Sequence, residues 1–225
     1  MPLFSRLDLT ALVWFLAAWI GYGYVVEFTP RGLSGLNGLM HRYRQQWMDR
    51  MLARDARMLD GQVISALQNG TAFFASTSLI ALGGAVTLFR STEDMLTVVA
   101  ALPFGAAVTH TEWEVKVMGL IIIFIYAFFK FAWSYRLYNY VAIMVGAAPP
   151  AAEQDMPEAK AYANSTAAVI TDAGRHFNRG QRAFFFALGY LGWFIGPLPL
   201  IATTAAILVV MWRRQFASES RRAVR

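Results

Sequence analysis

The sequence predicts an all-α integral membrane protein: a four-helix transmembrane bundle with amphipathic interfacial helices, forming a single membrane domain over residues 1–225. Hydrophobic residues make up 57% of the 225 positions. They gather into long runs that carry few or no charges. Four runs reach the roughly 20 residues that cross a hydrocarbon core about 30 Å thick, at about 1.5 Å of helix rise per residue.

The four expected spans differ in how they end. The run 63–89 carries no charged residue at all, and Pro149 and Pro150 follow the third run. The string Gly196-Pro197-Leu198-Pro199 interrupts the fourth run and predicts a kink, because each proline removes a backbone donor and crowds the preceding turn. We expect the spans at about 7–27, 62–90, 116–147 and 183–212.

Two segments between the runs have a helical apolar period with a polar opposite face, at about 37–60 and about 157–180. The first is strongly basic, which suits a helix that lies in a headgroup layer. A helix packed on the protein's own surface explains the same pattern equally well. In the first interpretation the anionic lipid headgroups contact Arg42, Arg44, Arg50, Arg54 and Arg57.

Small and polar side chains form one stripe along the second span. At 100° per residue they fall within an arc of about 80°. Such a stripe usually lets two helices approach closely and hydrogen-bond, and a water-lined path is the alternative. Its members are Gln62, Ser65, Asn69, Ala72, Ser76, Gly83 and Thr87.

The apolar run 95–108, after the second span, contains Pro103 and Gly105. At about 14 residues it is too short to span, so we expect it to be re-entrant or interfacial.

Basic residues near the spans decide the orientation only weakly. Four spans put both termini and the 90–116 loop on one side, with eight Lys and Arg, and the loops 31–61 and 149–182 on the other, with ten. Cytoplasmic loops carry an excess of Lys and Arg. Because the 90–116 loop is poor in both, we expect loops 31–61 and 149–182 to be cytoplasmic.

Lys130 and Arg136 lie inside the third run, where a charge is costly and normally has a partner. We expect Asn69 to bind Lys130, and Asp60 or Glu27 to bind Arg136. These side chains form either a structural polar network or the lining of an ion or substrate path. The complete expected network is Lys130, Arg136, Asn69, Asn139, Asp60 and Glu27.

The composition argues against several kinds of chemistry. The chain has no cysteine, which excludes disulfides and thiolate ligands, and its three histidines, His41, His110 and His176, share no ligand spacing. We expect no catalytic, cofactor or metal site, and therefore no enzyme. The net charge of +6 lies beside the apolar runs, so anionic lipid headgroups, and not nucleic acid, are the expected partners.

Three strings resemble bacterial members of the family catalogued as domain of unknown function 599. They are WMDRMLARDARMLDGQVISALQNGTAFFAST at 47–77, YAFFKFAWSYRLYNY at 126–140 and HFNRGQRAFFFALGYLGWF at 176–194. The resemblance implies a multipass protein of the bacterial cytoplasmic (inner) membrane and supplies no activity or catalytic residue. It includes Asp60, Gln62, Asn69, Lys130, Trp133, Arg136, Asn139, Asn178, Gly180 and Arg182.

Two functional hypotheses follow. In the first, the protein has a non-enzymatic structural or accessory role and packs with itself, as a homo-oligomer, or with a larger membrane complex. In the second, it is a small oligomeric channel or transporter with an anion-accepting path near Lys130 and Arg136.

Overall fold

The computed structural model describes residues 3–100, 109–219 and 223, and every regular element in them is a helix. The predicted all-α class is confirmed. The short run expected to be re-entrant lies partly outside the described residues, since 101–108 are not among them. The elements are α1 (Arg6–Phe28), α2 (Pro30–Leu33), α3 (Leu36–Leu52), α4 (Met58–Arg90), α5 (Thr92–Ala100), α6 (His110–Gly146), a 3-10 turn (Ala151–Glu153), α7 (Pro157–Tyr190), α8 (Gly192–Ile195) and α9 (Pro197–Phe216).

Local sequence explains where several helices begin. The Ser5 hydroxyl accepts a hydrogen bond from the backbone N–H of Asp8 and caps α1. Thr109 and Glu112 form a reciprocal capping box at the start of α6. Proline is the first residue of both α7 and α9, where its missing N–H costs no helical hydrogen bond.

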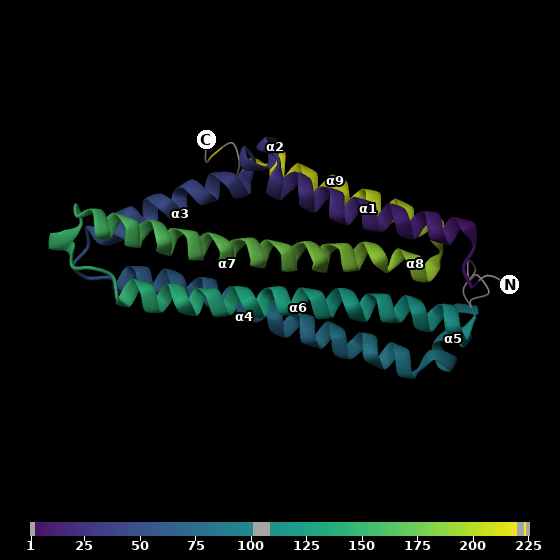
Figure 1. The fold of residues 1–225 in the computed structure, drawn as a ribbon. Helices are drawn as coiled ribbons and strands as arrows, with labels where there is room; N and C mark the ends of the chain where they lie inside the picture. Colours follow the sequence, from purple (N-terminus) through teal and green to yellow (C-terminus); the bar gives the residue numbers. More distant parts are fainter. Residues whose placement is uncertain (1–2, 101–108, 220–222, 224–225) are drawn as a thin grey trace.

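Three long helices set the shape of the molecule. Helices α4, α6 and α7 have 33, 37 and 34 residues, which corresponds to about 50–55 Å each. They run lengthwise side by side, with α1 and α9 along one half of the bundle and α3 along the other (Figure 1). Each long helix therefore exceeds the thickness of a hydrocarbon core.

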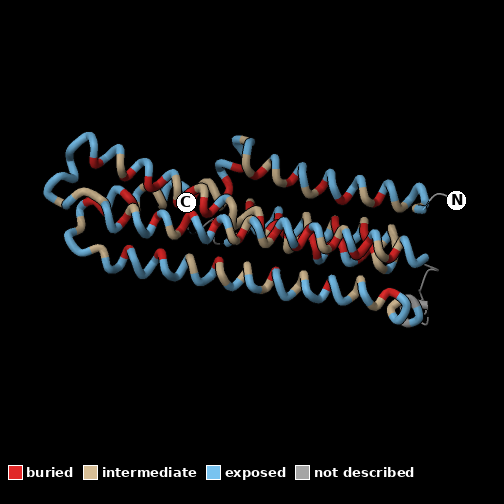
Figure 2. The backbone as a smooth tube through the Cα atoms, turned by 60° about the horizontal axis from the view of Figure 1, so that its bottom comes forward, coloured by how far each residue is buried: buried red, intermediate tan, exposed pale blue. Residues whose placement is uncertain are grey.

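The buried residues form two separate cores, one in each half. The first, which includes Phe15, Phe124 and Phe186, joins α1, α4, α6, α7, α8 and α9. The second, which includes Met48, Tyr138 and Ile170, joins α3, α4, α6 and α7. Burial follows the sides that the helices turn toward one another (Figure 2). We call these regions the five-helix half, after its five longer helices, and the four-helix half.

The long stretches of helix without charged residues lie mainly in the five-helix half. No Asp, Glu, Lys or Arg occurs in residues 9–26, 117–129, 183–195 and 197–212, and α4 is uncharged from 63 to 89. Four helices are long and apolar enough to cross a membrane, namely α1, α4, α6 and α9. The chain is therefore a multipass membrane protein, and the uncharged parts of α4, α6 and α7 lie beside α1 and α9.

The predicted single span 183–212 is wrong. Helix α7 continues from the polar segment to Tyr190, and after α8 the chain reverses at Gly196 into α9 (Figure 1). Gly196 has φ 157° and ψ 174°, a conformation that side chains disfavour, and Pro197 then starts a new helix. The break replaces the expected kink.

Helices α1 and α9 run parallel. The Trp193 indole N–H donates to Asp8 at 2.9 Å near the start of both, and the Tyr22 hydroxyl donates to the Met211 carbonyl at 3.1 Å near their ends. The end of α9 therefore lies beside the end of α1 and away from the start of α1, whereas the expected four spans put both termini on one side.

The amphipathic helices also differ from expectation. The predicted helix 37–60 stops at Leu52, because residues 53–57 form a non-helical link and Met58 begins α4. The segment 157–180 is the first part of α7 and not a separate helix lying in a headgroup layer. Helix α3 packs lengthwise on α7 through Met48, Met51 and Leu52, which favours the alternative of packing on the protein's own surface.

Candidate functional site

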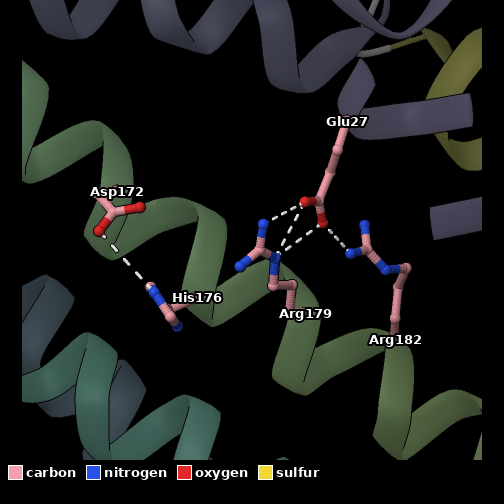
Figure 3. Close-up of polar contacts among 5 residues, drawn as sticks. All are labelled: Glu27, Asp172, His176, Arg179 and Arg182. Carbon is pink, nitrogen blue, oxygen red and sulfur yellow. Dashed lines mark hydrogen bonds and ion pairs between the residues drawn. The ribbon is translucent and has the colours of Figure 1, made fainter. Parts of the chain in front are cut away.

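Two arginines of α7 bind one carboxylate of α1 where the two halves meet. Arg179 donates to Glu27 through Nε at 3.0 Å to both oxygens and through Nη2 at 2.5 Å, and Arg182 donates through Nη2 (Figure 3). The Glu27 and Arg182 side chains are 14% and 9% exposed. The cluster therefore holds one carboxylate against two guanidinium groups and keeps a net positive charge.

The spacing of the arginines explains their common direction. Arg175, Arg179 and Arg182 recur at four and three residues, so they lie on one face of α7. Glu27 sits in the last turn of α1, just before the short turn into α2. The chain thus brings a carboxylate from the end of the first apolar run to the arginines that precede the apolar end of α7.

His176 lies one turn before this cluster on α7, in its charged part. Burial lowers the pKa of His176, and the Asp172 carboxylate, 3.8 Å away, opposes that shift (Figure 3). Among the described residues, the buried Nδ1 of His176 has no hydrogen-bond partner. Within the described ranges, no group of three or more His, Cys, Asp or Glu side chains is placed to hold a metal ion.

Arg182 lines three cavities that surround the cluster. The first, of about 80 Å³, also contains Arg214 and Gln215 of α9. The second, of about 70 Å³, reaches toward Arg44 of α3 and Arg175. Burial lowers the pKa of Arg44, and neighbouring Arg175 acts in the same direction. These cavities lie between the helices of both halves and are rich in positive charge.

The third cavity opens beside apolar side chains of α1 and α6. It has a volume of about 380 Å³ and includes Trp19, Tyr126, Arg179 and Arg182. On the other side of α1, an apolar groove of about 470 Å³ runs between α1 and α9 and includes Tyr22. Arginine head groups and apolar grooves therefore adjoin at one level of the bundle.

The predicted partners of Lys130 and Arg136 are wrong. The Lys130 ammonium lies 5.1 Å from the centre of the Tyr126 ring, and Arg136 is exposed and donates from Nε to the Tyr140 hydroxyl at 2.6 Å. Glu27 is bound by Arg179 and Arg182 instead. Neither Lys130 nor Arg136 lines any of the four cavities described above.

Asp60 belongs to a separate ion pair. Its buried carboxylate accepts hydrogen bonds from Arg54 at 2.5 Å and from the Trp47 indole at 2.6 Å. Because Arg54 is only six residues away across the α3–α4 link, it reaches Asp60 more directly than Arg136 of α6 does. Asp60 therefore ties the α3–α4 link to the start of α4 and does not join the expected network.

The arginines expected at lipid headgroups divide into two groups. Arg54 binds Asp60, Arg57 donates to the carbonyls of Ala148 and Pro149, and Arg44 is partly buried beside Gly174. The remaining two, Arg42 and Arg50, are exposed. Arg54 and Arg57 therefore bind within the chain, Arg44 packs against α7, and contact of Arg42 and Arg50 with lipid headgroups stays a prediction.

Asn139 and Asn69 have different environments. Asn139 accepts a hydrogen bond from Gln68 at 2.6 Å, which links α6 to α4. Asn69 is exposed and makes no hydrogen bond to any described residue, so the expected contact with Lys130 does not form. The α4 stripe containing Asn69 faces outward: six of its seven members are exposed, and Ala72 is half-buried.

Sequence reasoning missed Arg179, Arg214 and Gln215 as site residues. The signal for Arg179 was its spacing from Arg182, immediately before the uncharged run of α7. Arg214 and Gln215 follow the uncharged run of α9, which ends at Trp212, but nothing local to them indicates that α9 lies beside α1. Their place in the site depends on the reversal at Gly196.

Comparison with known proteins gives a family but no activity. A family model described as "Protein of unknown function, DUF599" matches residues 10–220. The searches of curated proteins and of solved structures found no match.

Proposed function

The chain belongs to the DUF599 family of unknown function, and we propose that it is a non-enzymatic structural or accessory membrane protein that packs against a second copy of itself along α4. The observation that carries this proposal is the outward direction of the polar stripe on α4.

Helix α4 leaves most of its surface uncovered. In their most apolar windows, 11% of α4 is buried, against 33% of α6. The side of α4 that is buried repeats every seven residues, which fits packing against one neighbouring helix. That seam consists of Ile64, Thr71, Ser78 and Ala85.

The polar stripe lies opposite this seam. At 100° per residue its centre is about 150° around the helix from the seam. No described residue lies within 4 Å of a Cβ added at Gly83 or Gly84, so their backbone is open to close approach by another helix. Large apolar side chains, including Phe73 and Ile80, are exposed on the same helix. A membrane helix with this surface suits a protein partner.

A second copy is the occupant that best fits the stripe. The Asn69 amide carries both donors and an acceptor, so two copies of it pair with each other across a two-fold axis. Serine and threonine hydroxyls at Ser65, Ser76 and Thr87 have the same self-complementary property.

We further propose that the five-helix half lies in the bacterial cytoplasmic membrane and that the four-helix half projects into the cytoplasm. Parallel α1 and α9 put the end of α9 on the side of loops 31–61 and 149–182. That side then holds fourteen described Lys and Arg, against Arg6, Arg90 and Lys116 on the other. The fourteen are Arg31, Arg42, Arg44, Arg50, Arg54, Arg57, Lys130, Arg136, Lys160, Arg175, Arg179, Arg182, Arg213 and Arg214.

Disulfide cross-linking tests the α4 interface, because the chain has no cysteine of its own. Single cysteines at Ser65, Ser76 and Gly83 should form disulfide-linked dimers in membranes on mild oxidation. Val13→Cys and Ile122→Cys are matched controls, since both positions are exposed and apolar but lie on α1 and α6. The controls should remain monomeric.

Two results would contradict the proposal. Equal cross-linking at Ile122 and Ser76 would remove the specific role of the stripe, and a monomeric mass in mild detergent would argue against self-association. Ion flux in liposomes that disappears in Lys130→Met would instead support the channel hypothesis.

A further inference from the structure

We propose that the cavity between α1, α3, α7 and α9 is a binding site for a phosphoryl group, carried by a membrane lipid or by a soluble phosphate. This goes beyond the proposed structural role and does not depend on it. The cavity is the one of about 80 Å³ that contains Arg182, Arg214 and Gln215.

The lining of this cavity is dominated by hydrogen-bond donors. It contains two guanidinium groups and four amide side chains, and in this described part of the chain it contains no carboxylate. Guanidinium groups match phosphate oxygens in geometry and charge, and amide N–H groups complete such sites. The donors are Asn37, Asn178, Gln181, Arg182, Arg214 and Gln215.

Gln215, which lines the cavity, carries an unpaired donor beside it. Its side chain is buried, with the residue 6% exposed, and its Nε2 has no hydrogen-bond partner within the described structure. A buried donor left unpaired is costly, and most such groups in native proteins have a partner. An oxygen of a bound phosphoryl group in the cavity would satisfy this amide.

The charges around the cavity favour an anion. Arg182 shares Glu27 with Arg179, so the single carboxylate is already bound by two guanidinium groups. Arg214, which stacks over the Phe185 ring at 5.7 Å, adds a second positive charge to the lining. The local excess of positive charge is compensated when an anion binds.

The position of the cavity allows a lipid to reach it. It lies where the uncharged stretches of α1 and α9 end, at the level where lipid headgroups meet a bilayer. Tyr22 lines both this cavity and the apolar groove between α1 and α9. A phosphoryl group in the cavity is therefore next to a groove that fits an acyl chain, although the same donors accept free phosphate.

Binding to the purified full-length protein in neutral detergent tests the site. We would measure thermal unfolding and native mass spectra with phosphatidylglycerol, with diacylglycerol, which lacks the phosphoryl group, and with inorganic phosphate. Gln215→Leu should weaken phosphoryl binding roughly tenfold or more, because a donor to a charged group is lost, while the unliganded protein keeps its stability. Gln181→Leu is a second variant that removes a donor without removing charge.

Arg214→Gln and Arg213→Gln form a matched pair. Both remove one charge from the end of α9, but only Arg214 lines the cavity, whereas Arg213 lines the apolar groove. We expect Arg214→Gln to weaken binding about tenfold and Arg213→Gln to change it less than about twofold.

The three ligands distinguish the sources. Stabilisation by phosphatidylglycerol alone identifies a lipid, by phosphate alone a soluble anion, and by both a site for the phosphoryl group itself. The proposal is overturned if phosphatidylglycerol and diacylglycerol act equally and phosphate has no effect. It is also overturned if both glutamine variants bind as wild type, or if Arg213→Gln loses as much binding as Arg214→Gln.

Discussion

The carboxylate of Glu27 in α1 and the guanidinium of Arg182 in α7 form an ion pair between residues 155 positions apart in the sequence. The pair lies where the apolar core of the five-helix half gives way to charged residues. It joins the first helix to α7 at the same level as the cavities.

Glu27→Gln should lower the free energy of unfolding by about 3–5 kcal/mol, because it leaves the buried Arg182 guanidinium without a counter-charge. Thermal or denaturant unfolding in detergent measures the change. Asp172→Asn is the control: its carboxylate is about half exposed, so its loss should cost less than about 1 kcal/mol. Equal effects of the two variants would show that Glu27 is not a special ion-pair partner.

Lys130→Met should change the free energy of unfolding by less than about 1 kcal/mol. Lys130 is only partly buried, and its contact with the Tyr126 ring is a cation–π interaction worth about 0.5–1 kcal/mol at such sites. The same unfolding assay checks this. A loss several times larger would mean that Lys130 has a buried partner that the structure does not contain among its described residues.

Asp60→Ala should lower the free energy of unfolding by about 2–4 kcal/mol, because the Trp47 indole and Arg54 both lose their acceptor. Asp55→Ala, in the same link but exposed, should change it by less than about 0.5 kcal/mol. If Arg54→Gln restored the stability of Asp60→Ala completely, the Trp47 hydrogen bond would contribute nothing.

Gly180→Ala should destabilise the bundle by about 1–3 kcal/mol, because the added Cβ would lie 2.7 Å from the Phe131 ring. Gly70→Ala has open space around it within α4 and should be neutral or stabilising, by up to about 1 kcal/mol. Unfolding midpoints of the pair measure both. Destabilisation by Gly70→Ala would indicate that another chain covers that face.

Cysteines at Ser5 and Ala217 should lie on opposite sides of the membrane, because parallel α1 and α9 separate the two ends. A membrane-impermeant thiol reagent applied to intact cells should label Ser5→Cys, and it should label Ala217→Cys only after permeabilisation. Labelling of both from the same side would support an even number of crossings instead.

Part of the fold follows directly from the sequence. Helices α1, α4 and α6 are predictable because each holds an apolar run, with few or no charges, that is long enough to cross a bilayer. The reversal at Gly196 is not, because residues 183–212 form one continuous apolar run and hydropathy does not report the direction of the chain. The glycine and the two prolines at 196–199 indicate where the helix is interrupted. Only the packing of α9 on α1 shows that the chain reverses there instead of bending.

At the charged site, the sequence indicated the carboxylates but neither their partners nor the part played by Arg179. Glu27 and Asp60 stood out as carboxylates beside apolar runs, yet each binds arginines other than the expected one. Asp60 takes the nearest arginine along the chain, and Glu27 takes two on a helix 152 and 155 positions away. Helical spacing shows which face Arg179 and Arg182 share, but it carries no information on which distant helix covers that face.

The pairing of α1 with α9 also has a consequence for biogenesis. The ribosome makes α1 first and α9 last. The hydrogen bond from the Tyr22 hydroxyl to the Met211 carbonyl therefore forms only when almost the whole chain has been synthesised. Until then one flank of the first inserted helix is covered only by lipid or by an insertion factor. A nascent chain truncated before Pro197 would keep that flank exposed, which offers quality-control proteases a direct sign of an incomplete product.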